Sequence, residues 1–351
     1  MKSKSVVFFL TLVIALSSLF FGYSSPVNAK TWTLKLSIEV PEMAPLCAQG
    51  FKPWAKEVEK ATNGRVKVVI YPSGTLCRVG DMLDAVQSGI ADLGWCWPGL
   101  HEGFAPLSMV SNLPMVFETA ESGSKAVWDL YENNTHIQDE YKDFKLVSFW
   151  ATDAYFFMSR KKPIHTISDL KGMKIRAANA TTVDFLKKLK ATPVMMRMPD
   201  VYMGLQKGTL DGTLAQGEAI QGFKFYEVIK YYTKPGMMPG SHIMIMNKKV
   251  WNSMPPDVQQ QFMSVSGGTL AAKIGRNVFD IATEGFPAKA TKEGAKYEII
   301  QLPPDEVDKF RQTAAVPVQK EWSESLEKKG LPARQILYEF KQLVKQYDGN
   351  K

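Results

Sequence analysis

The sequence predicts an α/β protein of two units, each a mixed, mainly parallel sheet flanked by helices. Strand-like and helix-like runs alternate along the chain, which is the rhythm of βαβ units. The pattern starts again after Ala151. Residues 30–351 are also too long a stretch for one ordinary domain and suit two.

The first unit begins with residues 32–40, where apolar and polar side chains alternate as in a strand. Asn63-Gly64 ends an amphipathic helix, and Gly89 ends the next one. The strands expected in this unit are 32–40, 65–71, 91–97 and 145–150, and the helices are 50–62, 81–88 and 120–131.

The second unit repeats this construction. Its expected strands are 155–159, 173–176, 192–196 and 212–215, and its helices are 182–189 and 200–207. Residues 241–247 then have the composition of a central strand, and Pro255-Pro256 opens a long helical stretch to about Ala282 that we expect to bridge the units. The chain after Pro303 is helical in pattern. The first unit thus comprises 30–152 plus about 241–282, and the second 153–240 plus about 283–351.

The N-terminus has the pattern of a cleaved signal peptide, residues 1–29. Lys2 and Lys4 form a basic region, residues 6–21 are apolar, and Val27-Asn28-Ala29 supplies small residues for cleavage. A membrane anchor is the alternative, but the apolar run is shorter than the ~20 residues that a span needs. We expect an exported chain without stable membrane insertion.

Composition and motifs exclude several classes of function. The formal net charge of +8 is spread along the chain without the basic, aromatic-rich tracts of nucleic-acid grooves. No spacing requires a metal or another cofactor, and no catalytic motif is present. Cys96 lies in an apolar run and is expected to be a buried thiol, whereas a disulfide between Cys47 and Cys77 stays open.

The strand-like run Lys174-Ile175-Arg176 ends on an arginine just before a predicted helix. Ligands of open parallel sheets bind outside the carboxyl ends of the strands. The planar guanidinium of Arg176 fits a carboxylate with two parallel hydrogen bonds. A solvated charge at a strand end is the alternative.

Several sequence blocks recur in an order and spacing that fit a known pattern over nearly all of the mature chain. They are YPSGTL (71–76), AVQSGIADLG (85–94), NLPMVF (112–117), SDLKGMKIRAANA (168–180), VYMGLQKGTLDG (201–212), FYEVIKYY (225–232) and MNKKVWNSMPPDVQQQF (246–262). As a set they resemble the solute-binding proteins of TRAP transporters, the DctP-like family.

The resemblance implies a two-lobed periplasmic binding protein of the type II-like fold, which closes on a small-molecule carboxylate and delivers it to the membrane subunits of a TRAP permease. It also implies that Arg176 binds the carboxylate. The best-known sialic-acid-binding branch carries a second arginine where this chain has residues 153–157, and an asparagine after the DG that residues 213–216 lack. A heavily hydroxylated sugar acid would therefore leave unsatisfied hydroxyls in this site.

Aromatic residues stand at strand ends in both units. Alternation places Trp95 and Trp97 on one face of their strand, and Phe156 and Phe157 lie at the matching edge of the second unit. Core packing is one interpretation. The other is an apolar pocket for an apolar or aromatic carboxylate, although a small organic acid, including a dicarboxylate, stays open.

Four further residues are candidates for the ligand site. Asn179 follows Arg176 by three residues, Glu39 and Gln216 lie in loops at strand ends, and His242 opens the strand 241–247. A structural role is the alternative for His242. Two other functions stay open beside transport: a subunit that presents the ligand to a sensor, and an exported enzyme on the same fold.

Overall fold

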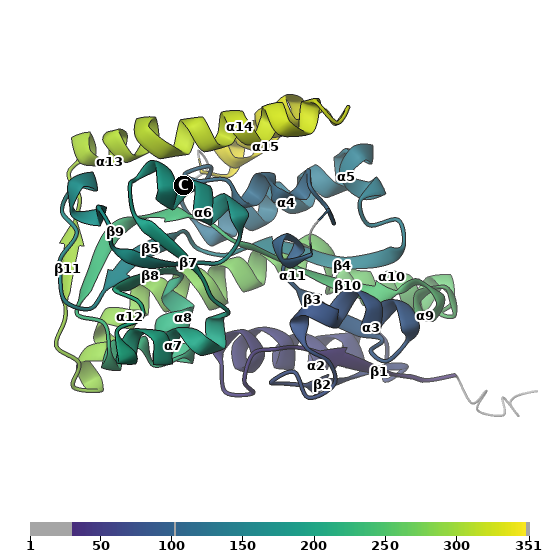
Figure 1. Ribbon diagram of the computed structural model, residues 1–351. Helices are drawn as coiled ribbons and strands as arrows, with labels where there is room; N and C mark the ends of the chain where they lie inside the picture. The colour runs from purple at the N-terminus through teal and green to yellow at the C-terminus, as the bar shows by residue number, and fades with distance from the viewer. Residues whose placement is uncertain (1–29, 102, 349–351) are drawn as a thin grey trace, which may run out of the picture.

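Two mixed β-sheets covered by helices make up the part of the chain that the computed structural model describes, residues 30–101 and 103–348 (Figure 1). Sheet A contains, in spatial order, β2 (Val66–Tyr71), β1 (Trp32–Ser37), β3 (Leu93–Cys96), β10 (Ser241–Asn247) and β4 (Phe144–Ala151). Sheet B contains β11 (Glu298–Gln301), β9 (Tyr231–Met238), β5 (Tyr155–Ser159), β8 (Gly212–Ala215), β6 (Lys174–Ala177) and β7 (Thr192–Met195). The predicted signal peptide lies outside the described residues.

Each sheet is parallel except around one inserted strand. In sheet A, β1 runs parallel to β2 and β3, and β10 is antiparallel to β3 and β4. In sheet B, β5 is antiparallel to β8 and β9, while β6 runs parallel to β7 and β8, and β11 to β9. The predicted two-lobed α/β fold is confirmed. Strands β9 and β11 were not predicted.

Helices cover the faces of both sheets. The α-helices are α2 (Lys52–Ala61), α3 (Met82–Ser88), α4 (Ala120–Asn133), α5 (Thr135–Asp139), α6 (Ala180–Lys188), α7 (Met198–Lys207), α8 (Gly217–Gly222), α9 (Lys248–Asn252), α10 (Pro256–Ser264), α11 (Gly267–Ile274), α12 (Ile281–Lys292), α13 (Pro304–Phe310), α14 (Val316–Glu327) and α15 (Ala333–Asp348). Wider π-helical segments span Leu46–Phe51, Gly275–Asp280 and Arg311–Ala315. Single 3₁₀ turns span Val79–Asp81, Pro98–Leu100, Ser108–Asn112, Ile167–Leu170 and Phe225–Glu227.

The helical stretch expected from Pro256 to Ala282 is interrupted once and then bridges the lobes. Helix α10 ends at Ser264, and α11 begins at Gly267, whose φ of +53° favours glycine. From there α11 continues through the π segment into α12. Helix α11 packs on α4 and β4 beside sheet A, whereas α12 packs on α8 beside sheet B. The lobe-spanning helix is thus confirmed, with a later start.

Two short crossovers also join the lobes, residues 152–154 after β4 and 239–240 before β10. They are tied together, because Thr152 N donates to Gly240 O at 2.9 Å and Gly240 N donates to Thr152 Oγ1 at 3.0 Å. The C-terminal helices extend over both lobes, because α14 packs on α6 and α15 packs on α4 (Figure 1).

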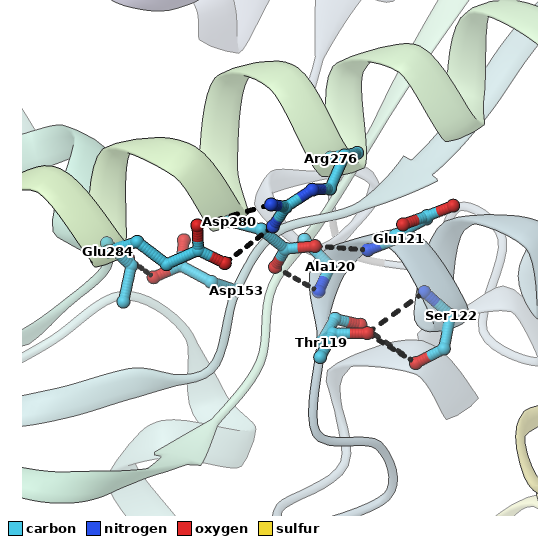
Figure 2. Close-up of polar contacts among 9 residues, drawn as sticks. Thr119, Ala120, Glu121, Ser122, Asp153, Arg276, Asp280 and Glu284 are labelled. Atoms are coloured by element: carbon cyan, nitrogen blue, oxygen red, sulfur yellow. Dashed lines mark hydrogen bonds and ion pairs between the residues drawn. The ribbon is translucent and has the colours of Figure 1, made fainter. Parts of the chain in front are cut away.

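Polar side chains hold the bridging helix to the crossover region (Figure 2). Asp280 accepts hydrogen bonds from Ala120 N at 2.8 Å and Glu121 N at 3.1 Å, at the start of α4. Asp153, in the first crossover, accepts from Gly217 N at 3.0 Å and from the Thr283 hydroxyl. Burial raises the pKa of Asp153 to about 7.

The three cysteines are free. Cys47 and Cys96 are buried, and the Cys77 thiol lies 3.2 Å from Ser37 Oγ. The disulfide left open for Cys47 and Cys77 is therefore not formed, and the buried thiol expected at Cys96 is confirmed. Among the described residues, no helix combines the length and the apolar character that crossing a membrane requires.

Candidate ligand-binding site

Two adjoining cavities lie where residues of both sheets meet. The first, called the arginine cavity, is lined by Trp97, Gly99, Leu100, Asn112, Tyr155, Arg176, Ala178, Asn179, Met198, Gln216, Ser241 and His242. The second, called the acidic cavity, is lined by Glu39, Val40, Leu46, Trp95, Trp97, Met198, Pro199, Gln216, Glu218, Phe223, His242 and Phe279. They share four lining residues, so we treat them as one site.

Strand direction explains why these residues converge. Arg176 and Gln216 lie at or just beyond the carboxyl ends of the parallel strands β6 and β8. Tyr155 and His242 lie at the beginning of β5 and β10, which run antiparallel to their neighbours. The start of an antiparallel strand meets the carboxyl ends of the parallel ones at the same edge of a sheet. The site is therefore at the edge that α/β proteins use for ligands.

Arg176 is a buried cation without a protein counter-ion. The residue is 2% exposed. Its Nε donates to Met196 O at 2.9 Å, and its Nη1 lies 3.5 Å from Leu214 O. No carboxylate of the described residues lies within ion-pair distance. Burial lowers the pKa of Arg176 to about 10, so the guanidinium stays charged at neutral pH. A buried charge is costly unless it is paired, which makes this group suited to an anionic ligand.

Other polar atoms around the site also lack partners. Buried atoms without a hydrogen bond to another described residue are Trp95 Nε1, Trp97 Nε1, Gln216 Oε1, Glu218 Oε1 and His242 Nδ1. Buried polar atoms in native proteins are nearly always hydrogen-bonded. Five such atoms line these two cavities, where a bound molecule would supply the missing donors and acceptors.

The side-chain amide of Asn179 uses only its oxygen in hydrogen bonds within the protein. Its Oδ1 accepts from Thr182 N at 2.9 Å and Thr182 Oγ1 at 3.0 Å, which caps the N-terminus of α6. The side chain lines the arginine cavity, and its Nδ2 donates to no described residue. Asn179 thus combines the structural role of a cap with a free donor.

Asn112 and Ser241 line the arginine cavity and were not predicted from the sequence. Asn112 Nδ2 donates to Ser241 Oγ at 2.5 Å, and Ser241 N donates to Asn112 Oδ1 at 3.2 Å. The paired contacts fix the first residue of β10 beside the cavity. A single asparagine in a 3₁₀ turn and a serine at the start of a strand carry no sequence signal for such a position.

His242 lies in a cage of aromatic rings. Its ring centroid is 5.0 Å from that of Trp95, 5.8 Å from Trp97 and 5.9 Å from Phe279. Burial lowers the pKa of His242 to about 3, so the ring is neutral at physiological pH. His242 is therefore a hydrogen-bonding group in the site and carries no charge.

Two carboxyl groups line the acidic cavity. Glu39, which follows β1, pairs with Arg197, just before α7, at 3.1 Å, and this ion pair connects the two lobes beside the cavity. Burial raises the pKa of Glu39. Glu218, in the first turn of α8, is 3% exposed, and burial raises its pKa to about 7. Glu218 was not predicted, since an acidic residue in a first helical turn is ordinarily solvated.

Phe156 and Phe157 line neither cavity, which corrects the expectation that they face the ligand. Phe156 stacks on Phe286 at 5.7 Å between centroids, and Phe157 packs against Phe310. Both belong to the hydrophobic core, because β5 is buried on both faces. Tyr155, the residue before them, lines the arginine cavity instead.

The chain belongs to the family of bacterial extracellular solute-binding proteins, family 7, whose model matches residues 37–325. This confirms the resemblance found in the sequence. The family is one of solute-binding proteins and not of enzymes, and it is extracytoplasmic.

Solved structures and a sequence relative of known ligand class extend this finding. A TRAP solute-binding protein from Rhodoferax ferrireducens T118, in complex with copurified benzoate, is 26% identical, with a TM-score of 0.84 over 90% of this chain and 98% of that one. One from Bordetella bronchiseptica with bound (R)-mandelate and (S)-mandelate is 28% identical, with a TM-score of 0.80 over 90% and 99%. The C4-dicarboxylate-binding periplasmic protein DctP of Rhodobacter capsulatus is 28% identical over 70% of this chain and 74% of its own length.

Proposed function

We propose that this protein captures an aromatic or apolar organic acid between its lobes, with the carboxylate on Arg176, and delivers it to the membrane subunits of a TRAP permease. Its place of action is the periplasm, which it reaches by the signal peptide predicted at residues 1–29. The protein binds the acid and releases it unchanged.

The single observation that carries this proposal is Arg176, a buried guanidinium whose partners are backbone carbonyls. A carboxylate supplies the missing negative charge and accepts two parallel N–H bonds in the geometry that arginine favours. Asn179 Nδ2, on the next helix, is a further donor in the same cavity.

The remainder of the site suits an apolar ligand body. Trp97 and Met198 line both cavities, and Trp95 and Phe279 line the acidic cavity. Aromatic side chains bury large areas of a flat ligand at little entropic cost. The ligands named for two relatives above, benzoate and mandelate, combine a carboxylate with an aromatic ring.

Binding from both lobes requires hinge closure, which suits delivery to a transporter. The crossovers at 152–154 and 239–240 are the segments about which the lobes would move. The Glu39–Arg197 ion pair joins the lobes only when they are close together, so it belongs to the closed form.

A thermal-shift screen over aromatic, aliphatic, amino and sugar acids tests the proposal. A ligand at ~100-fold its dissociation constant adds roughly 2.7 kcal/mol of stability by mass action. We expect aromatic monocarboxylates such as benzoate to raise the melting temperature by several degrees. Protection by sugar acids alone, or by amides of the same acids as strongly as by the acids, would contradict it.

A further inference from the structure

The end of the site away from Arg176 is acidic and contains a carboxyl group that accepts a backbone hydrogen bond from Leu46 and has one unpartnered oxygen. Glu218 lines the acidic cavity but not the arginine cavity, whereas the reverse holds for Arg176. The side chain of Glu218 is buried, its Oε1 has no hydrogen bond within the described ranges 30–101 and 103–348, and no cation of those ranges pairs with it. Glu39 lines the same cavity.

We infer that Glu218 determines specificity by accepting a hydrogen bond from a hydroxyl at the far end of the ligand and by excluding a second carboxylate there. The substrates are then hydroxylated aromatic monocarboxylic acids, and aromatic dicarboxylic acids are rejected. This inference rests on the proposed function, because it assumes that the ligand's own carboxylate occupies Arg176.

A hydroxyl matches the unpartnered atoms of this cavity better than any purely accepting group. Trp95 Nε1 and Trp97 Nε1 are unpartnered donors, and Glu218 Oε1 is an unpartnered acceptor. A hydroxyl both donates and accepts, so one group satisfies the carboxyl and an indole N–H together. A ligand without it leaves Glu218 unsatisfied in a buried place, which a site built for hydrogen bonding penalises.

A second carboxylate on the ligand would be unfavourable in the acidic cavity. It only accepts hydrogen bonds, so at pH 8, above the pKa of about 7 that burial gives Glu218, it would satisfy the indoles and still face an ionised carboxylate. Glu39 also lines this cavity, and Arg197, the cation beside it, is already paired with Glu39 at 3.1 Å. Like charges in a partly dehydrated cavity repel strongly. The acidic cavity thus opposes dicarboxylates that Arg176 alone would accept.

Titration calorimetry at pH 8 with five matched acids tests this: benzoate, 3- and 4-hydroxybenzoate, isophthalate and terephthalate. The wild type is expected to bind one hydroxybenzoate ~10-fold tighter than benzoate, and the dicarboxylate of the same ring geometry at least ~10-fold more weakly than benzoate. Glu218→Leu should lose the preference for the hydroxyl, so that it binds the hydroxybenzoate no more tightly than benzoate. Glu218→Gln keeps an acceptor and should relieve the penalty on the dicarboxylate.

The control is Glu42→Gln, which removes an exposed carboxyl paired with Lys52 at 2.7 Å and outside both cavities. It should leave all five affinities unchanged. The inference is overturned if both Glu218 variants keep the wild-type order of affinities, or if the wild type binds a dicarboxylate as tightly as benzoate. A wild type that binds none of the five acids would overturn the proposed function, and the inference with it.

Discussion

Replacing Arg176 by methionine separates ligand binding from folding. In the ligand-free protein the substitution removes the 2.9 Å bond to Met196 O and the 3.5 Å contact with Leu214 O. It also removes a buried charge, whose pKa burial lowers to about 10. That fall corresponds to roughly 3 kcal/mol of penalty on the charged form, similar to what one or two charge-assisted hydrogen bonds contribute. The two effects offset each other, so we expect the free energy of unfolding to change by less than about 1.5 kcal/mol.

Ligand binding should respond very differently. Loss of a two-pronged carboxylate contact removes about 3–5 kcal/mol, which weakens binding by roughly 100- to 4000-fold. Titration calorimetry with benzoate measures the affinity, and urea unfolding without ligand measures the stability. Arg334→Met is the matched control, since its side chain is 67% exposed, pairs with Glu327 at 3.0 Å and lines neither cavity. A loss of affinity below tenfold, or a loss of stability above about 3 kcal/mol, would refute the assignment of Arg176 as the anchor.

Three further predictions concern closure, pH and packing. Arg197→Ala should raise the rate of ligand release about two- to fivefold, because it breaks the half-exposed ion pair to Glu39 between the lobes. Stopped-flow fluorescence measures the release rate, and an unchanged rate would contradict the prediction. Burial raises the pKa of Asp153 from 3.8 to about 7, so between these pH values the folded state keeps a proton that the unfolded state has lost, and stability falls as the pH rises. Asp153→Asn should flatten that fall and add up to roughly 4 kcal/mol to the free energy of unfolding at pH 8, measured by urea unfolding. An unchanged dependence of stability on pH would contradict this. Gly217→Ala should lower the free energy of unfolding by about 1–3 kcal/mol, since a Cβ there would lie 2.6 Å from a backbone atom of the bridging helix, whereas Gly285→Ala, with nothing within 4 Å, should be tolerated.

The strands that frame the site were predictable because their sequences are uniform. Residues 155–159, 212–215 and 241–247 have the bounds expected from their runs of apolar and β-branched side chains. Strand β9 was missed because it contains Lys234-Pro235-Gly236, which ordinarily argues against a strand. Strand β11 is only four residues long and mostly exposed, so only its pairing with β9 defines it.

The site residues that could be predicted from the sequence are those at or just beyond the ends of strands. Arg176, Trp97, Gln216 and His242 converge because the strand order brings their edges together. Phe156 was misplaced because β5 is buried on both faces, and alternation then gives no distinction between core and cavity.

Glu218 was missed for a different reason. It stands in the first turn of α8, where acidic residues commonly serve the helix terminus in solvent. Its buried carboxyl accepts a backbone hydrogen bond from Leu46 of the other lobe, a contact between residues far apart in the chain. Tertiary contacts of this kind leave no local pattern.

A crystal structure of the protein with benzoate tests the central claim most directly. The account predicts both carboxylate oxygens about 2.7–2.9 Å from guanidinium nitrogens of Arg176, with the ring against Trp97 and Met198. A benzoate whose carboxylate lies away from Arg176, or an Arg176 paired with a carboxylate of the protein, would contradict it.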